Sequence, residues 1–127
     1  MLNRIHHISI ICSDYERSKA FYTNILGLDI TRETFRQERQ SFKLDLSLNG
    51  EYVIELFSFP VPPQRLSRPE ATGLRHLAFE VDNLDNAIEI IRKNNIITEP
   101  IRIDETTNKR FTFFADPDNL PIELYEK

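Results

Sequence analysis

The sequence predicts an α+β fold made of two βαβββ modules, and three observations support this class. Short stretches with the alternating pattern of strands occur in the same order in both halves of the 127-residue chain. One amphipathic helical segment follows the first strand of each half. A stretch that holds four of the seven prolines, residues 60–73, separates the halves. We therefore expect one domain, residues 1–127, composed of a module 1–59, a linker 60–73 and a module 74–127.

The first module is expected to contain a strand, a helix and three further strands. Ser13 or Asp14 can cap the helix, and Gly27 suits the residue that follows its C-terminus. The dipeptide Asn49-Gly50 predicts a hairpin between the last two strands. The second strand soon loses its apolar face, so we expect it at a sheet edge. The five expected ranges are 4–12, about 14–26, 28–35, 42–47 and 51–59.

The second module repeats this order. Pro100 weakens the strand that should follow its helix, because proline lacks a backbone N–H for the sheet. The stretch Asp116-Pro-Asp-Asn predicts a turn before the last strand. The five expected ranges are 74–81, 82–94, 96–103, 110–114 and 120–125.

Four polar side chains interrupt the apolar strands at duplicated positions. His7 and His76 are 69 residues apart, and Glu55 and Glu123 are 68 apart, so each module has one histidine on its first strand and one glutamate on its last. Such groups are rare in buried strands unless they are paired or bind a metal. Because strand side chains alternate in direction, each should point away from its apolar neighbours. If the last strand pairs beside the first, each module presents one His/Glu pair to a shared concavity.

This ligand set predicts one divalent metal ion per site. Two imidazoles and two carboxylates suit Ni²⁺, Co²⁺, Zn²⁺, Mn²⁺ or Fe²⁺, and we leave the metal open among these five. Four protein ligands on an octahedral ion leave two positions for substrate oxygens, as in catalytic sites. The ordinary alternatives are a structural histidine and a Glu–Arg ion pair, and the duplication favours the metal. His6 is expected on the face opposite to His7.

Composition excludes several classes of partner. The net charge is −4 and no basic stripe stands out, which argues against nucleic acid. No run of 18 apolar residues and no apolar signal core are present, so we expect a cytoplasmic protein without a membrane segment. The one cysteine, Cys12, cannot form an internal disulfide, which is typical of a reducing compartment.

Several stretches resemble a known family. HHISIICSDYERSKAFYTNILGL is similar to the first βα unit of the vicinal-oxygen-chelate superfamily, which holds glyoxalases, bleomycin resistance proteins and dioxygenases; RHLAFEVDNLDNAI is similar to its second unit and FFADPDNLPIELYE to its last hairpin. ELFSFP, RPEATGLRHLAF and KRFTFFADPDNLPIELYE resemble the bacterial, glyoxalase-like YaeR subgroup. The resemblance implies a curved sheet of paired βαβββ modules around a metal cleft, in a homodimer. It places the metal at His7, Glu55, His76 and Glu123.

The resemblance also implies an activity. The His-Glu-His-Glu order is similar to bacterial glyoxalase I, so we expect a metal-dependent lyase or isomerase of the lactoylglutathione lyase type. Its substrate would be a small molecule that chelates the metal through vicinal oxygens, with Glu123 or Glu55 as the catalytic base. Glutathione-type enzymes carry an arginine where this chain has Ile11, so a glutathione substrate is not implied.

Two other functions and two assemblies remain open at this point. The alternatives are a metal-dependent resistance transferase or hydrolase of the fosfomycin type, and a non-enzymatic protein that binds a small molecule such as a drug. Each site can lie within one chain or be shared across a dimer. Five basic side chains are interpreted as solvated surface charges and not as substrate ligands: Arg36, Lys43, Arg68, Lys109 and Arg110.

Overall fold

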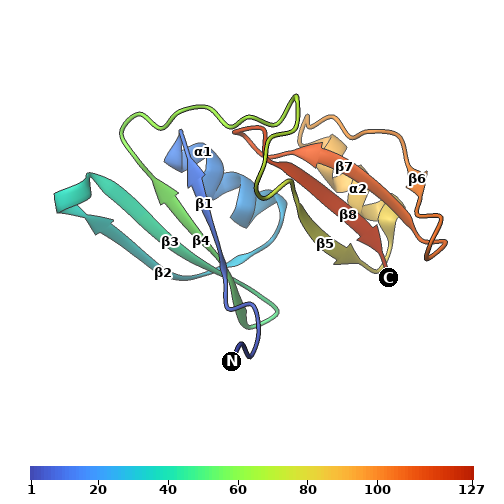
Figure 1. Cartoon of the computed structure of the whole chain (residues 1–127), viewed down its shortest axis with the longest axis horizontal. Coiled ribbons are helices and arrows are strands. Elements are labelled where there is room, and N and C mark those ends of the chain that lie inside the picture. The colour runs from blue at the N-terminus through green and yellow to red at the C-terminus, as the bar shows by residue number, and fades with distance from the viewer. The chain divides into compact units, whose positions relative to one another are not determined.

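The computed structural model describes all residues, 1–127, and divides them into two compact units, Met1–Gln64 and Arg65–Lys127, here called unit 1 and unit 2 (Figure 1). Each unit contains a four-stranded sheet with a helix before its second strand. The strand orders are β1-β4-β3-β2 and β5-β8-β7-β6. In both sheets the first strand lies parallel to the last. The α+β class and the predicted pairing of first and last strands are therefore confirmed.

The regular elements follow the predicted order. No helix of the chain has the length and apolar character needed to cross a membrane. Between residues 59 and 76 the chain forms only turns and bends, as the prolines predicted. In unit 1 the elements are β1 (Ile8–Cys12), α1 (Tyr15–Ala20), a π-helix (Phe21–Ile25), β2 (Asp29–Arg36), a 3-10 turn (Gln37–Arg39), β3 (Ser41–Leu48) and β4 (Glu51–Ser58). In unit 2 they are β5 (Leu77–Val81), α2 (Leu84–Lys93), β6 (Arg102–Ile103), β7 (Arg110–Ala115) and β8 (Pro121–Glu126).

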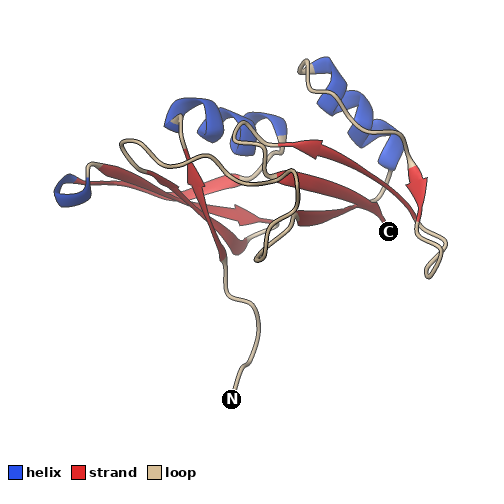
Figure 2. Cartoon of the chain, turned by 45° about the horizontal axis from the view of Figure 1, so that its top comes forward, coloured by secondary structure: helices blue, strands red, loops and turns tan.

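In unit 1 the helical segment covers one face of the sheet (Figure 2). Alternate residues of the central strands, Leu44 and Leu46 on β3 and Ile54 and Leu56 on β4, are at most 1 % exposed and form the core on that face. Burying such side chains contributes about 1.5–3 kcal/mol each. Glu55, between the last two, must therefore point to the other face of the sheet.

The helix of unit 1 differs from the prediction in its second half. Asp14 caps α1 by accepting a hydrogen bond from the Arg17 backbone N–H, but the α-helix ends at Ala20 and continues as a π-helix. The wider turn places two consecutive side chains, Phe21 and Tyr22, in the core with 3 % and 0 % exposure. Both side chains belong to the apolar stripe of the helical segment, so their burial agrees with the sequence pattern although the hydrogen-bonding pattern changes.

Three strands are shorter than predicted, and one of them is β5, which begins at Leu77 and not at residue 74, so that His76 lies just before it. β1 begins at Ile8, not at residue 4, so His7 lies just before the strand. The expected strand 96–103 is reduced to β6, two residues long. Pro100 interrupts the expected strand. Before this proline, Glu99 still makes two hydrogen bonds to β7: its N–H donates to the Phe113 carbonyl at 2.8 Å, and its carbonyl accepts from the Thr112 hydroxyl at 2.7 Å. Pro100 thus ends the ladder for the predicted reason.

A β-bulge changes one face of β4. The β3–β4 register runs Leu46 opposite Ile54 and then Ser47 opposite Tyr52, so Val53 has no partner. One extra residue reverses the alternation beyond it. Simple alternation along β4 would place Tyr52 on the core face with Ile54; instead its hydroxyl reaches Asp45 on the face of Glu55. The hairpin itself is as predicted, with Asn49 and Gly50 at φ 51° and 82°.

Candidate metal and substrate site

Unit 1 brings His7 and Glu55 into contact. The parallel register places Ser9 of β1 opposite Glu55 of β4, and His7 lies two residues before Ser9. The His7 Nε2 atom is 3.1 Å from Glu55 Oε2, and the two side chains are 35 % and 14 % exposed. The predicted juxtaposition within this half is therefore present, on the sheet face that the helical segment leaves open.

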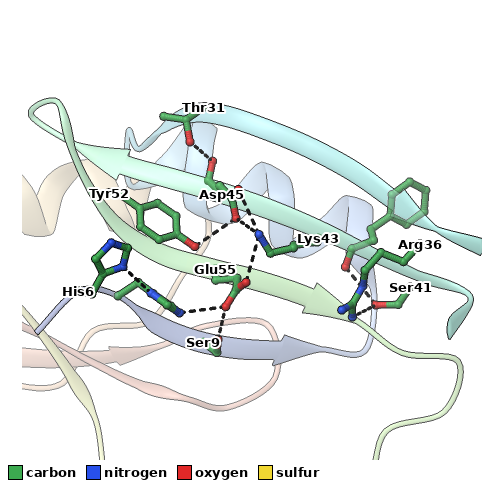
Figure 3. A network of polar contacts seen from close by, with 11 residues as sticks. His6, Ser9, Thr31, Arg36, Ser41, Lys43, Asp45, Tyr52 and Glu55 are labelled. Carbon is green, nitrogen blue, oxygen red and sulfur yellow. Dashed lines mark hydrogen bonds and ion pairs between the residues drawn. The ribbon is translucent and has the colours of Figure 1, made fainter.

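Glu55 is held by further partners (Figure 3). The Ser9 hydroxyl donates to Glu55 Oε2 at 2.6 Å, and Lys43 Nζ lies 3.2 Å from Oε1. Lys43 also bonds Asp45 at 3.0 Å, and this hydrogen bond raises its pKa above the usual value. Although burial raises the pKa of Glu55, the hydrogen bonds from Ser9 and Lys43 more than offset it and lower the pKa below 4.5. Glu55 is thus kept ionised and oriented.

The ring of His7 is oriented by its other neighbours. His6 Nδ1 lies 2.8 Å from His7 Nδ1, which leaves the Nε2 atom of His7 directed at Glu55. Both imidazoles also contact the Tyr52 ring, with centroids 5.5 and 5.2 Å away. His6 was predicted on the opposite face from His7. That prediction is wrong because both precede β1, where strand alternation does not apply.

Unit 2 repeats the contact. His76 Nε2 is 3.0 Å from Glu123 Oε2, with side chains 30 % and 13 % exposed. The linker supports this histidine, because Arg65 donates to the carbonyls of Leu74 and Arg75 at 2.6 and 2.9 Å. The His76 ring also packs edge-on against Phe113, with centroids 5.1 Å apart.

The two pairs differ in their surroundings. Position by position, Ala78 takes the place of Ser9 beside the glutamate, and Phe113 takes the place of Asp45 opposite it. No hydroxyl or ammonium group therefore reaches Glu123, whose carboxylate contacts His76. The unit 1 glutamate is bound within a polar network, whereas the unit 2 glutamate has a single polar partner.

The geometry of each pair fits a divalent metal. Two ligand atoms that are each about 2.1 Å from one ion and at right angles lie about 3.0 Å apart. The observed separations are 3.1 and 3.0 Å. Neither carboxylate is paired with an arginine, the ordinary alternative for such a glutamate. No three His, Cys, Asp or Glu side chains gather as a ligand group, and each unit brings one His/Glu pair into contact.

Sequence reasoning missed four side chains near Glu55. Lys43 was interpreted as a solvated surface charge, but it is paired with Asp45 and Glu55. Ser9 lies on the face of Glu55 by simple alternation and was detectable from the pattern. Asp45 and Tyr52 required the β3–β4 register and the bulge, which the sequence does not reveal.

Comparisons with known proteins agree with this architecture. A profile of the "Glyoxalase/Bleomycin resistance protein/Dioxygenase superfamily" matches residues 4–124. The chain is 65 % identical to YwkD of Bacillus subtilis over 100 % of its own length and 99 % of YwkD, and 60 % identical to YaeR of Escherichia coli over 99 % and 98 %. It is 35 % identical to the lactoylglutathione lyase of Salmonella typhimurium, over 97 % of the chain and 92 % of the enzyme. The crystal structure of a glyoxalase family protein from Enterococcus faecalis superposes with a TM-score of 0.89 at 46 % identity, over 97 % of each chain.

Proposed function

Because the chain belongs to the Glyoxalase/Bleomycin resistance protein/Dioxygenase superfamily, we propose that it is a divalent-metal-dependent lyase or isomerase. Its substrate would be a small molecule that chelates the metal through two vicinal oxygens. Members of this superfamily bind small molecules and commonly use a divalent metal. The observation that carries the proposal is the repeated contact of a histidine Nε2 with a glutamate Oε2 at equivalent positions of both units.

The proposed ligands are one His/Glu pair from each unit. The nitrogen and oxygen donors suit Ni²⁺, Co²⁺, Zn²⁺, Mn²⁺ or Fe²⁺. When bound, the ion would polarise a substrate carbonyl and stabilise the negative charge that develops on its oxygen. The four proposed ligands are His7, Glu55, His76 and Glu123.

The two glutamates have different proposed roles. Glu55 is fastened by Ser9 and Lys43, so it suits a fixed ligand. Glu123 contacts His76 without such anchors and can turn away from it with less loss of hydrogen bonding. We therefore assign Glu123 as the base that takes a proton from the carbon next to the substrate carbonyl. The active assembly is proposed to be a cytoplasmic homodimer with two sites, in which the pairs meet within one chain or across two.

The first experiment measures metal content and proton exchange with a panel of candidate substrates. Protein purified without a metal-chelating tag is analysed for metals, and 2-oxoaldehyde adducts with glutathione and other thiols are incubated with it in D₂O. NMR should show catalysed exchange of the C–H proton next to the carbonyl. Glu123→Gln should abolish exchange but keep measurable metal binding, whereas Glu55→Gln should weaken both.

Two outcomes would sink the proposal. One is a protein that takes up no divalent metal, and the other is full activity after the loss of either carboxylate. A growth assay with fosfomycin separates the epoxide-opening alternative, since that chemistry removes no C–H proton. Ligand binding that is indifferent to a chelator would indicate a non-enzymatic binding protein. If sedimentation shows a monomer that binds one metal tightly, a site that is shared across a dimer is excluded.

A further inference from the structure

Arg36, at the end of β2, is a half-buried cation without a carboxylate partner. Its Nε atom is buried and has no hydrogen-bond partner. One terminal nitrogen donates to the Ser41 hydroxyl at 3.2 Å, and the guanidinium carbon lies 4.5 Å from the centre of the Phe57 ring. A buried donor without an acceptor is destabilising, so its retention calls for a physical reason.

Comparable arginines of the chain are neutralised. Arg110 is also half-buried, and it bonds Glu126 at 2.7 Å and Asp85 at 3.1 Å. Arg102 lies over the Phe111 ring much as Arg36 lies over Phe57, and it bonds Glu99 at 2.9 Å. Arg36 combines the partial burial of Arg110 with the ring stacking of Arg102, but it lacks the carboxylate partner of either. An anion from outside the chain would complete it.

The strand register places Arg36 on the same sheet face as Glu55. Arg36 is opposite Ser41, and Lys43, two residues further along β3, is opposite Phe57. Directly opposed residues share a face, as do residues two apart on one strand. Figure 3 shows Arg36 and Ser41 on the side of the sheet that carries Lys43 and Glu55. Because Phe57 is two residues from Glu55, the guanidinium lies about 7 Å along the strand from the glutamate.

Neighbouring side chains leave this position to an incoming group. The nearest cation, Lys43, is already shared between Asp45 and Glu55, so its charge is largely balanced. Ile11, beside Phe57 in the β1–β4 register, is 54 % exposed and adds an apolar flank. Along this face of the sheet, the His/Glu pair is thus followed within a short distance by a cation that is stacked on an aromatic ring.

We propose that Arg36 is the anion-binding residue of the substrate site, and that the substrate carries an oxyanion, a carboxylate or phosphate, about 7 Å from its metal-chelating oxygens. The planar guanidinium can offer N–H groups of its terminal nitrogens to the oxygens of such a group. This inference rests on the proposed function for the chelating part of the site. It narrows the substrate class to small oxyacids with a vicinal oxygen pair at one end.

The test uses two hydroxamates that differ only in their tail. A hydroxamate chelates through two vicinal oxygens; one probe ends in a carboxylate two methylene groups away, and the other ends in the primary amide. Both are titrated into Co²⁺-loaded protein, where the cobalt absorption spectrum reports chelation. Wild type should bind the carboxylate probe about 10-fold more tightly than the amide, the size expected for one charge-assisted contact. In Arg36→Gln that preference should fall below about 2-fold, with affinities for Co²⁺ and the amide probe unchanged.

Matched variants test whether the preference depends on the position of Arg36 or only on positive charge in general. Arg39→Gln removes an exposed cation three residues away and should keep the wild-type preference. Arg36→Lys retains the charge without the planar pair of donors and should keep part of the wild-type preference. Equal binding of both probes by wild type, or an undiminished preference in Arg36→Gln, would overturn the assignment.

A metal-free arm distinguishes this inference from the proposed function. Inorganic phosphate added to the protein in chelator should shift the NMR signals of the Arg36 guanidinium in a saturable way, because the only acceptor that this group has within the chain is the Ser41 hydroxyl. Absence of the shift overturns the anion subsite. A shift together with failure of both hydroxamates to perturb Co²⁺ would instead overturn the metal chelation of the proposed function.

Discussion

Replacing Ser9 with alanine tests whether the network around Glu55 supports metal binding. The Ser9 hydroxyl donates at 2.6 Å to Glu55 Oε2, the same oxygen that lies 3.1 Å from His7 Nε2. The equivalent position of unit 2 is Ala78, beside Glu123, so an alanine already occupies this strand position in the repeat. The Ser9→Ala variant should therefore fold normally, and the substitution should affect only the Glu55 carboxylate.

The expected magnitude follows from the contacts. A hydrogen bond to a charged group contributes about 1.5–3 kcal/mol, which is about 10- to 100-fold in an equilibrium constant. Lys43 remains 3.2 Å from the other carboxylate oxygen, so Glu55 stays partly oriented in the variant. We expect the lower end, a loss of about 10-fold in metal affinity, as for other partners of metal ligands.

Competition titration with a chromogenic chelator measures this loss. The reciprocal variant Ala78→Ser adds a hydroxyl beside Glu123 and should leave affinity unchanged or raise it. In a Glu55→Gln background the Ser9→Ala effect should shrink below about 2-fold, because the charge that the hydroxyl supports is gone. An equal effect in both backgrounds, or no effect in wild type, would refute the role given to Ser9.

Two further predictions concern stability. Gly50→Ala should lower the free energy of unfolding by about 1 kcal/mol in urea denaturation, since φ is +82° at this turn; its added methyl would meet no atom within 4 Å, so a much larger loss would contradict a purely backbone cause. Glu33 receives hydrogen bonds from Lys19, at 2.6 Å, and from Tyr15, and both lower its pKa below 4.5. A depressed carboxyl pKa contributes stability that is present above pH 4.5 and is lost as the pH falls through the lowered value. Glu33→Gln should thus lower the free energy of unfolding by about 0.5 kcal/mol at pH 7, since Glu33 is exposed, and the difference should shrink steadily as the pH falls below 4.5; a difference that does not change with pH in this range would show that the contact does not depend on charge.

The duplicated strand pattern made much of the fold predictable. Alternation on β3 and β4 identified the core face, and Asn49-Gly50 identified the hairpin between them. The same alternation placed Glu55 opposite to that core, and its repeat at Glu123 indicated a matching position in unit 2. These features depend on local periodicity, which a single sequence carries in full.

Features that depend on pairing could not be predicted in the same way. The π-helix changes the backbone hydrogen bonding and the bulge at Val53 reverses the direction of Tyr52, and neither has a marker in the local pattern. Lys43 looked like a surface charge because its partners, Asp45 and Glu55, are recognisable only once β3 and β4 are in register. Arg36 was set aside for the same reason, since Phe57 is 21 residues away in the chain.

The sequence by itself determined that the chain holds two copies of a βαβββ unit, that each copy carries one histidine and one glutamate at repeated positions, and that each glutamate lies on a strand face turned away from the core. Periodicity suffices for this because strand alternation is a local property of the backbone. Only the tertiary structure decided that each histidine touches its glutamate, that Glu55 is anchored while Glu123 is not, and that Arg36 lacks a carboxylate. Those facts arise from cross-strand distances of a few ångströms between residues far apart in the chain, which no local pattern encodes.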